Sequence, residues 1–222
     1  MCYTVSKEEE IMPEKNIYRP TPVPRLLEVR ELYSLHYFTY SRSFRFEGES
    51  HPFWEAVCCD GGEAEVTDGD NVFRLRRGQA VLHAPGVFHN VRPLLAGTST
   101  IIFGFGGDLA AIERSTGTIQ QLSAEAQRWM RAALRCGRNA FSPPLNRVYQ
   151  YSLEVRAGQE GALQQVRNAL ENFLLCLPDQ EAVPVPETHG DTVRRIEEVL
   201  AASVGSKLTI GSLAERLGYS PT

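Results

Sequence analysis

The chain has 222 residues and a formal net charge of −4, and 42% of its residues are hydrophobic. This length and composition suffice for one domain of ordinary size plus an appendage. The negative charge argues against nucleic-acid binding over the whole surface, but it does not exclude a specific DNA-binding segment. No run reaches the roughly 18 consecutive apolar residues of a membrane helix, and the acidic N-terminus does not fit a signal peptide. We therefore expect a cytoplasmic protein without a membrane partner.

The first 24 residues are polar and contain Pro13, Pro20, Pro22 and Pro24, which favour an extended N-terminal arm. Short runs rich in β-forming residues follow, separated by glycine-containing turns. The predicted strands cover residues 32–40, 53–59, 63–67, 71–75, 79–83 and 98–105. Closely spaced strands of this kind are typical of an antiparallel sandwich or barrel. We expect one all-β unit over residues 25–107.

After residue 107 the hydrophobic period changes from two to about 3.6. Ser123 is placed to cap a helix that ends near Gly137. A second predicted helix, residues 159–177, carries an apolar row in alternating steps of three and four, as in a coiled coil. The row consists of Leu163, Val166, Leu170, Phe173 and Leu177. We expect residues 108–177 to pair two chains through this row, and packing of the row onto the barrel or the first helix is the alternative.

The last part of the chain has the pattern of helices joined by a tight turn. Polar residues and three prolines over residues 178–190 indicate a linker. Residues 191–222 then predict two short amphipathic helices, with Gly218 ending the second one. Ser220 and Pro221 suit the N-cap and first position of a further helix. This order predicts a helix-turn-helix, although an ordinary helical hairpin has the same pattern.

One region of the β unit combines histidines with carboxylates. The set consists of Glu49, His51, Glu55 and His89, and two imidazoles with one or two carboxylates suit zinc, iron, manganese or nickel. On a straight strand His51 and Glu55 would lie about 13 Å apart, so they share a metal only if the chain bends, which Pro52 permits. The interpretation that we favour is that these side chains hydrogen-bond inside the barrel or contact an organic ligand.

We expect the mouth of the barrel to bind a small-molecule effector, because apolar walls with a few placed polar groups are typical of ligand pockets. Strand alternation favours Phe53 over Trp54 as the inward residue, unless the chain bends at Pro52. For each aromatic side chain the alternative is a place in the core. The predicted effector contacts are His36, Tyr40, His51, Phe53, Glu55 and His89.

The order of these polar residues resembles the paired motifs of the cupin superfamily of small β-barrels. The matching residues are Gly48, Glu49, His51, Glu55, Gly62, Gly78, Pro85, Gly86 and His89. Where the metal-binding pattern of the superfamily has its first histidine, this chain has Glu49. The resemblance implies a cupin-like antiparallel barrel followed by helices, that is, a mixed fold of β then α.

The C-terminal helices resemble the start of the DNA-binding domain of AraC/XylS-family transcriptional regulators. The residues that carry this resemblance are Ile196, Leu208, Leu213, Ala214, Gly218 and Ser220. Members of that family continue through a recognition helix and a second helix-turn-helix, so we expect the chain to be a fragment of a longer regulator.

Together the two resemblances imply a non-enzymatic regulator with no cofactor. Its barrel would bind a small effector, for which a sugar is one candidate, its helices would form a homodimer, and its C-terminal domain would bind promoter DNA. The rival hypothesis is a metal-dependent cupin enzyme, such as a dioxygenase or isomerase. In that case His51, Glu55 and His89 would hold the metal, with Glu49 as a possible fourth ligand.

Overall fold

The computed structural model describes residues 19–177, together with residues 199, 209, 211 and 212. The first part of the N-terminal arm and the linker lie outside the described residues. The same holds for the predicted scaffold residues of the DNA-binding domain, which are Ile196, Leu213, Ala214, Gly218 and Ser220. The domain boundaries at both ends of the chain therefore stay predictions.

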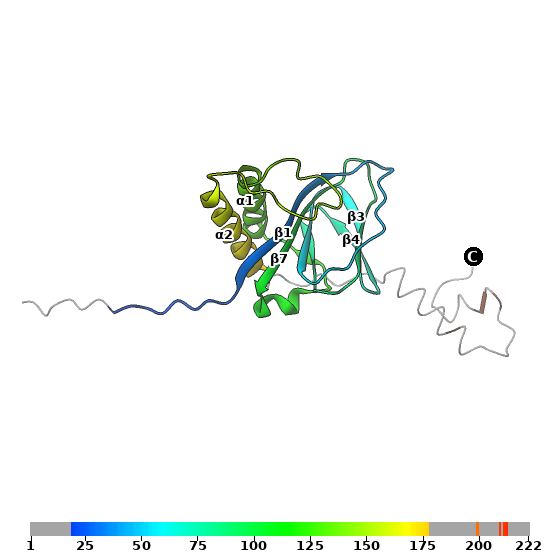
Figure 1. Ribbon diagram of the computed structural model, residues 1–222. Coiled ribbons are helices and arrows are strands. Elements are labelled where there is room, and N and C mark those ends of the chain that lie inside the picture. Colours follow the sequence, from blue (N-terminus) through cyan, green and yellow to red (C-terminus); the bar gives the residue numbers. More distant parts are fainter. Residues whose placement is uncertain (1–18, 178–198, 200–208, 210, 213–222) are drawn as a thin grey trace, which may run out of the picture.

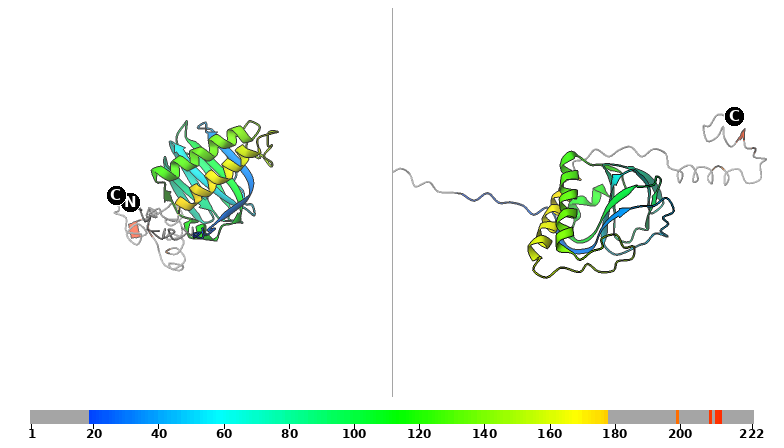
Figure 2. Two further views of the ribbon diagram at one scale, coloured as in Figure 1. Left: turned by 90° about the vertical axis from the view of Figure 1, so that its left-hand side faces the viewer. Right: turned by 90° about the horizontal axis from the view of Figure 1, so that it is seen from above.

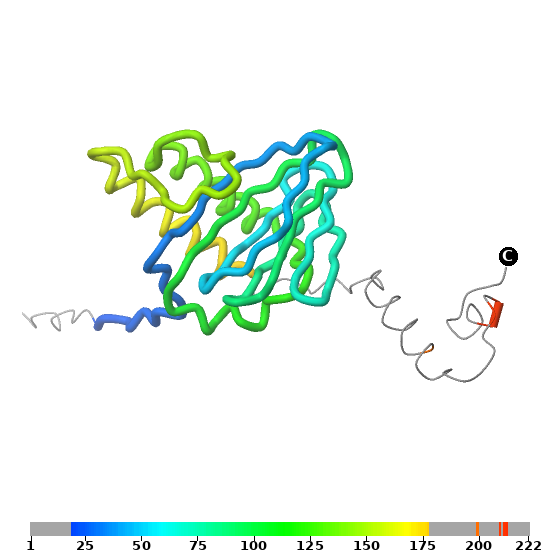
Figure 3. The backbone as a smooth tube through the Cα atoms, turned by 45° about the vertical axis from the view of Figure 1, so that its right-hand side comes forward, coloured from blue at the N-terminus to red at the C-terminus, as the bar shows by residue number. Residues whose placement is uncertain are grey.

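The β unit consists of two antiparallel sheets that face each other (Figure 1, Figure 3). The larger sheet has five strands in the order β1 (Glu28–Thr39), β7 (Ser99–Asp108), β2 (Trp54–Gly61), β5 (Gln79–His83) and β8 (Gln120–Gln121). The smaller sheet has three, in the order β4 (Asn71–Arg76), β3 (Glu63–Asp68) and β6 (His89–Pro93). The predicted fold class, antiparallel β structure followed by helices, is confirmed, but the strands form two facing sheets and do not close into the predicted barrel.

Helices cover the face of the five-stranded sheet that turns away from the smaller sheet. A 3-10 helix, η1 (Ala110–Ser115), precedes α1 (Ala124–Ala140) and α2 (Glu160–Cys176), and α1 and α2 lie side by side across the strands (Figure 2). The predicted cap is confirmed, because the Ser123 hydroxyl oxygen accepts a hydrogen bond of 3.1 Å from the Ala126 backbone N–H. Gly137 allows α1 to approach the sheet closely, since a Cβ there would collide with Leu35.

The predicted pairing row of α2 is buried within one chain. Val166, Leu170 and Phe173 are 0% exposed and Leu177 is 1% exposed, while Leu163 is partly buried beside the same core. The row packs with α1 and the five-stranded sheet in a single apolar cluster, which is the alternative that the sequence also allowed. Pairing of two chains through this row stays a prediction.

The segment between α1 and α2 has no clear pattern in the sequence, yet its two ends are fixed by the backbone. Ser142 N–H donates to Glu154 O and Arg156 N–H donates to Ala140 O, both at 2.8 Å. Tyr37 N–H of β1 donates to Leu145 O, also at 2.8 Å, and ties the segment to the edge of the sheet. No helix among the described residues is long and apolar enough to cross a membrane.

Candidate metal centre and ligand pocket

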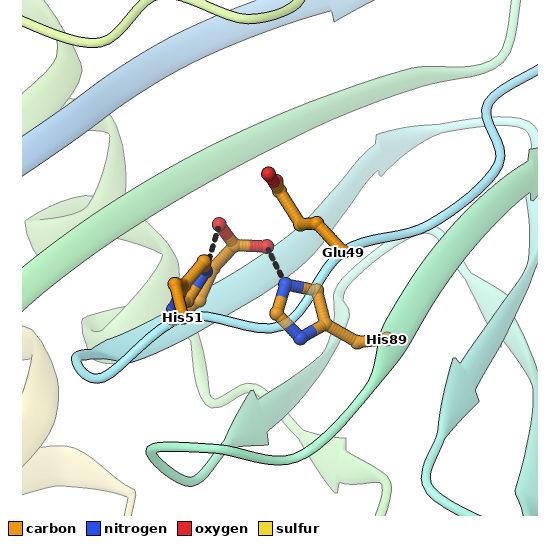
Figure 4. Close-up of side chains that lie close together, drawn as sticks. Glu49, His51 and His89 are labelled. Carbon is orange, nitrogen blue, oxygen red and sulfur yellow. Dashed lines mark ion pairs between the residues drawn. The ribbon is translucent and has the colours of Figure 1, made fainter.

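Four predicted polar residues converge between the two sheets. One ligand atom from each of Glu49, His51, Glu55 and His89 lies within 4.8 Å of all the others. Glu49 and His51 precede β2, Glu55 is the second residue of β2, and His89 begins β6. Figure 4 shows the two imidazole rings pointing toward the carboxylate that lies between them. Two separate stretches of the chain, residues 49–55 and the start of β6, therefore build the cluster.

A bend in the chain brings His51 and Glu55 together. β2 begins only at Trp54, and Pro52 and Phe53 form a bend before it, which is the bend that Pro52 permits. His51 Nε2 lies 3.5 Å from Glu55 Oε2 as a result. Glu49 is held beside the cluster by two backbone hydrogen bonds of 2.9 Å with His89, one in each direction. The separation expected on a straight strand thus does not apply.

Backbone carbonyls fix the tautomers of both imidazoles. His51 Nδ1 lies 3.0 Å from Phe53 O and His89 Nδ1 lies 2.9 Å from Val87 O. A carbonyl oxygen only accepts, so each Nδ1 carries the proton and donates it. In the neutral rings both Nε2 atoms then present lone pairs to the Glu55 carboxylate, and both are buried without a hydrogen-bond partner. This arrangement lacks a positive charge at its centre, which a proton or a metal ion supplies.

Burial and neighbouring charges shift the pKa values of the side chains in the cluster. Burial opposes the ionised form of Glu55, but the surrounding imidazoles outweigh it and hold the pKa of Glu55 below its ordinary value. Burial also opposes the charged form of His51, yet the Glu55 carboxylate raises the pKa of His51. For His89 burial prevails and lowers its pKa. Of the two imidazoles, His51 is therefore the one whose protonated form the Glu55 carboxylate stabilises more than burial opposes it.

The cluster has the donor set and supporting contacts of a transition-metal site. Ligating histidines usually donate their second ring N–H to a backbone carbonyl or carboxylate, as His51 and His89 do. Two imidazoles with carboxylates suit zinc, iron, manganese or nickel. Glu49 and Glu55 supply two negative charges, which one divalent ion balances. The described residues therefore fit such a metal.

A buried pair that the sequence did not reveal supports the cluster. His83 is 0% exposed, and its Nδ1 lies 2.6 Å from Asp68 Oδ1. The His83 ring stacks on His89 with 4.6 Å between centroids and an interplanar angle of 13°. His83 is also the cross-strand partner of Glu55, and Asp68 is that of His89. The pair thus joins the two sheets directly behind two candidate ligands.

A pocket opens beside the cluster, and it includes only some of the predicted effector contacts. His36, Tyr40, Glu55 and His89 line it. Phe53 stacks instead on the ring of His51, at 3.6 Å between centroids, so its contact is with a candidate ligand. Several lining residues were not predicted from the sequence, namely Phe38, Phe44, Phe46, Asn90, Val91, Ile102, Val148 and Tyr149. Alternation along β1, where His36 and Phe38 are two residues apart, could have revealed Phe38.

Comparisons with known proteins gave only structural similarities. No family model matches the chain and no curated protein matches it. The AraC-like transcriptional activator CuxR has a TM-score of 0.37 at 10% identity, covering 85% of this chain and 65% of that one. ToxT from Vibrio cholerae also has a TM-score of 0.37, at 8% identity and with 87% and 69% covered. A cupin family protein from Methanocaldococcus jannaschii has a TM-score of 0.32 at 11% identity, with 43% and 93% covered.

Proposed function

We propose that the chain is part of a transcription regulator, whose β unit binds a small-molecule effector and whose C-terminal residues contribute to binding promoter DNA as a homodimer. The observation that carries this proposal is the composition of the pocket wall. Val148 and Tyr149 line the pocket, and they belong to the segment that joins α1 to α2. A ligand in the pocket therefore contacts the segment from which α2 leads toward the predicted helix-turn-helix.

The anchoring of this segment supports a coupling role. The two ends of the segment are joined by backbone hydrogen bonds, and Leu145 O accepts a hydrogen bond from Tyr37 N–H. Tyr149, in contrast, is 59% exposed and contacts Phe46 at the pocket, with 5.9 Å between ring centroids. Ligand binding shifts an equilibrium only by its difference in affinity for two arrangements. An exposed Tyr149 beside the ligand, on a segment fixed to both helices, provides such a difference.

We further propose that the cluster of Glu49, His51, Glu55 and His89 holds one divalent transition-metal ion in this pocket. The support is the pair of Nε2 lone pairs directed at one carboxylate. The metal would then form part of the effector site.

Binding to DNA tests the regulator proposal. Protein produced from the natural gene would be titrated onto the DNA upstream of that gene, with and without Zn²⁺ or Mn²⁺. We expect specific binding to DNA with an affinity that changes when the metal is added. Glu55→Gln should abolish this effect of the metal. Glu47→Gln, at an exposed position of the same segment, is the control and should preserve it. Absence of specific DNA binding under both conditions would contradict the proposal.

A second candidate function is a metal-dependent enzyme of the cupin type, and the convergence of four ligand atoms beside a pocket favours it. A bound metal would polarise an oxygen atom of the substrate, and Glu49, whose side chain is exposed at the rim of the cluster, could move a proton. The two candidates differ in what happens to the ligand. Mass spectrometry after incubation with metal-loaded protein would show it unchanged for a regulator and converted for an enzyme.

A further inference from the structure

The wall of the pocket is mostly apolar and aromatic. Phe38 comes from β1, Tyr40, Phe44 and Phe46 follow that strand, and Ile102 comes from β7. Ring centroids lie 5.6 Å apart for Phe38 and Tyr40 and 4.7 Å apart for Tyr40 and Phe44. Such a wall stabilises an apolar ligand body and leaves most hydroxyls of a sugar without hydrogen-bond partners.

The charges that line the pocket disfavour an anionic ligand. Among the described residues that line it, none is Lys or Arg, whereas Glu49 and Glu55 are carboxylates. One divalent metal ion at the cluster balances these two charges. An anionic ligand would leave the metal, the two carboxylates and the ligand with a net negative charge, and burial of an unbalanced charge is costly. An uncharged ligand avoids this cost.

One buried acceptor in the pocket lining lacks a donor. Asn90 Nδ2 donates a hydrogen bond of 2.8 Å to Phe46 O, which fixes the orientation of the amide. Asn90 Oδ1 is then buried without a partner, and an amide oxygen can only accept. Because buried polar atoms nearly always have partners, a hydroxyl of the ligand is the complementary group. A carboxylate has no proton to donate.

We propose that the organic ligand of this pocket is a compact, uncharged alcohol or phenol. Its hydroxyl lies near the metal cluster and Asn90, and its apolar body lies against the aromatic wall. This inference rests on the proposed function, in which the pocket is a binding site beside a metal. The open pocket has a volume of about 50 Å³, room for only a few water molecules, so the ligand body extends outward beside the exposed Tyr149.

Three probes of similar shape and different charge test the inference: benzyl alcohol, benzoate and benzylammonium. Uptake of Mn²⁺ or Zn²⁺ by the whole chain would be measured first, because it tests the metal site by itself. Calorimetric titration of the metal-loaded protein with each probe follows. We expect benzyl alcohol to bind at least tenfold more tightly than benzoate and to raise the melting temperature.

The outcomes separate the two levels of the proposal. If the metal binds but benzoate binds as tightly as benzyl alcohol, or benzyl alcohol does not bind up to its solubility, the ligand class is wrong and the metal site stands. If no metal binds and benzylammonium is preferred, the two carboxylates serve an organic cation and both proposals are wrong.

A matched pair of variants locates the hydroxyl. Asn90→Leu keeps the approximate size of the side chain but removes Oδ1, and we expect benzyl alcohol to bind about tenfold more weakly while metal uptake is retained. Asn168→Leu, on the exposed side of α2, should change neither. Unchanged binding of benzyl alcohol by Asn90→Leu would contradict the assignment. Should this variant not fold, the order of probe affinities in the unaltered protein still decides the ligand class.

Discussion

The two faces of the five-stranded sheet bury different kinds of side chains, although neighbouring residues of the same strands supply both. In β2, Ala56 and Cys58 belong to the apolar core under the helices, whereas Glu55 and Val57 face the smaller sheet. In β5, Leu82 lies under the helices and His83 lies between the sheets. The core under the helices consists of apolar side chains, whereas the inner face also buries His36, Glu55 and His83, opposite His89 of the smaller sheet.

This difference indicates which face stabilises the fold and which face is suited to binding a ligand. Burial of polar and charged groups is costly unless each has a partner, yet Nε2 atoms of three inner histidines have none. Among the described residues, the apolar cluster under the helices carries no such cost, and it is the larger of the two apolar clusters. We therefore expect substitutions on the helix side to affect stability and substitutions on the inner side to affect binding.

The largest expected effect is on the helix side. Phe173 is 0% exposed and packs near Phe103, with 6.2 Å between ring centroids. Phe173→Ala should lower the free energy of unfolding by about 3–5 kcal/mol, measured by urea denaturation, without weakening metal binding in the protein that remains folded. Leu175→Ala, at a position that is 38% exposed, is the control and should cost far less. A stability loss below about 1 kcal/mol for Phe173→Ala, with loss of chain pairing instead, would favour the predicted dimer seam.

The second-largest expected effect is a loss of metal affinity on the inner face. Glu55 lies 3.5 Å from an Nε2 atom of both His51 and His89, so Glu55→Gln removes the charge that faces both candidate ligands. We expect metal affinity to fall by more than about 100-fold, because even changes around the ligands cost 10–100-fold. Calorimetric titration with Zn²⁺ measures the change, and Glu47→Gln is the matched control. Equal affinities for the two variants would remove Glu55 from the site.

A smaller loss of metal affinity is expected for residues that contact a candidate ligand without binding the metal themselves. Asp68 holds His83, and His83 stacks on His89, so Asp68→Asn should loosen the orientation of His89. We expect about a tenfold loss of metal affinity with little change in affinity for DNA in the absence of metal. Asp70→Asn changes an exposed carboxylate in the same turn and should leave the metal affinity unchanged. If the two variants behave alike, His83 and Asp68 serve only to join the sheets.

The sequence predicted the strands and helices whose patterns are local, and it missed those that depend on distant partners. Alternation and periodicity located β2 to β5, α1 and α2, because each pattern repeats within one element. β6 begins with His89 and Asn90 and contains Arg92, which are weak strand formers, so its pairing with β3 determines it. For the same reason the contact between Asp68 and His83, which crosses from one sheet to the other, has no signature in the sequence.

The cluster residues of the candidate site could be predicted from the sequence, but their relative positions could not. Residue types and spacing identified the four members of the cluster, but the separation of His51 and Glu55 depended on a bend that composition only permits. Tyr149 could not be found, because the segment that carries it has no periodicity and reaches the pocket only through the packing of the two helices.

The smallest expected effect is a dependence of stability on pH that arises from the inner face and not from the helix-covered face. The Glu55 carboxylate raises the pKa of His51 above its ordinary value of 6.5, and this value is restored in the unfolded chain. In metal-free protein the resulting stabilisation is fully present below pH 6.5 and is lost as the pH rises through the higher folded-state pKa. Metal affinity should rise over the same interval, because the proton on His51 competes with the metal. Melting temperatures of the metal-free and metal-loaded protein should therefore diverge above pH 6.5.

A variant at His51 and a variant on the helix side test the origin of this divergence. His51→Gln should remove the loss of stability above pH 6.5 in metal-free protein, because glutamine does not titrate. Below pH 6.5 a decline should persist, since burial lowers the pKa of His89 and the unfolded chain then binds more protons than the folded one. Phe173→Ala should shift both melting curves downward without changing their dependence on pH. If His51→Gln keeps the divergence, the titrating group lies outside the cluster, and the inner face does not hold the proton that its geometry requires.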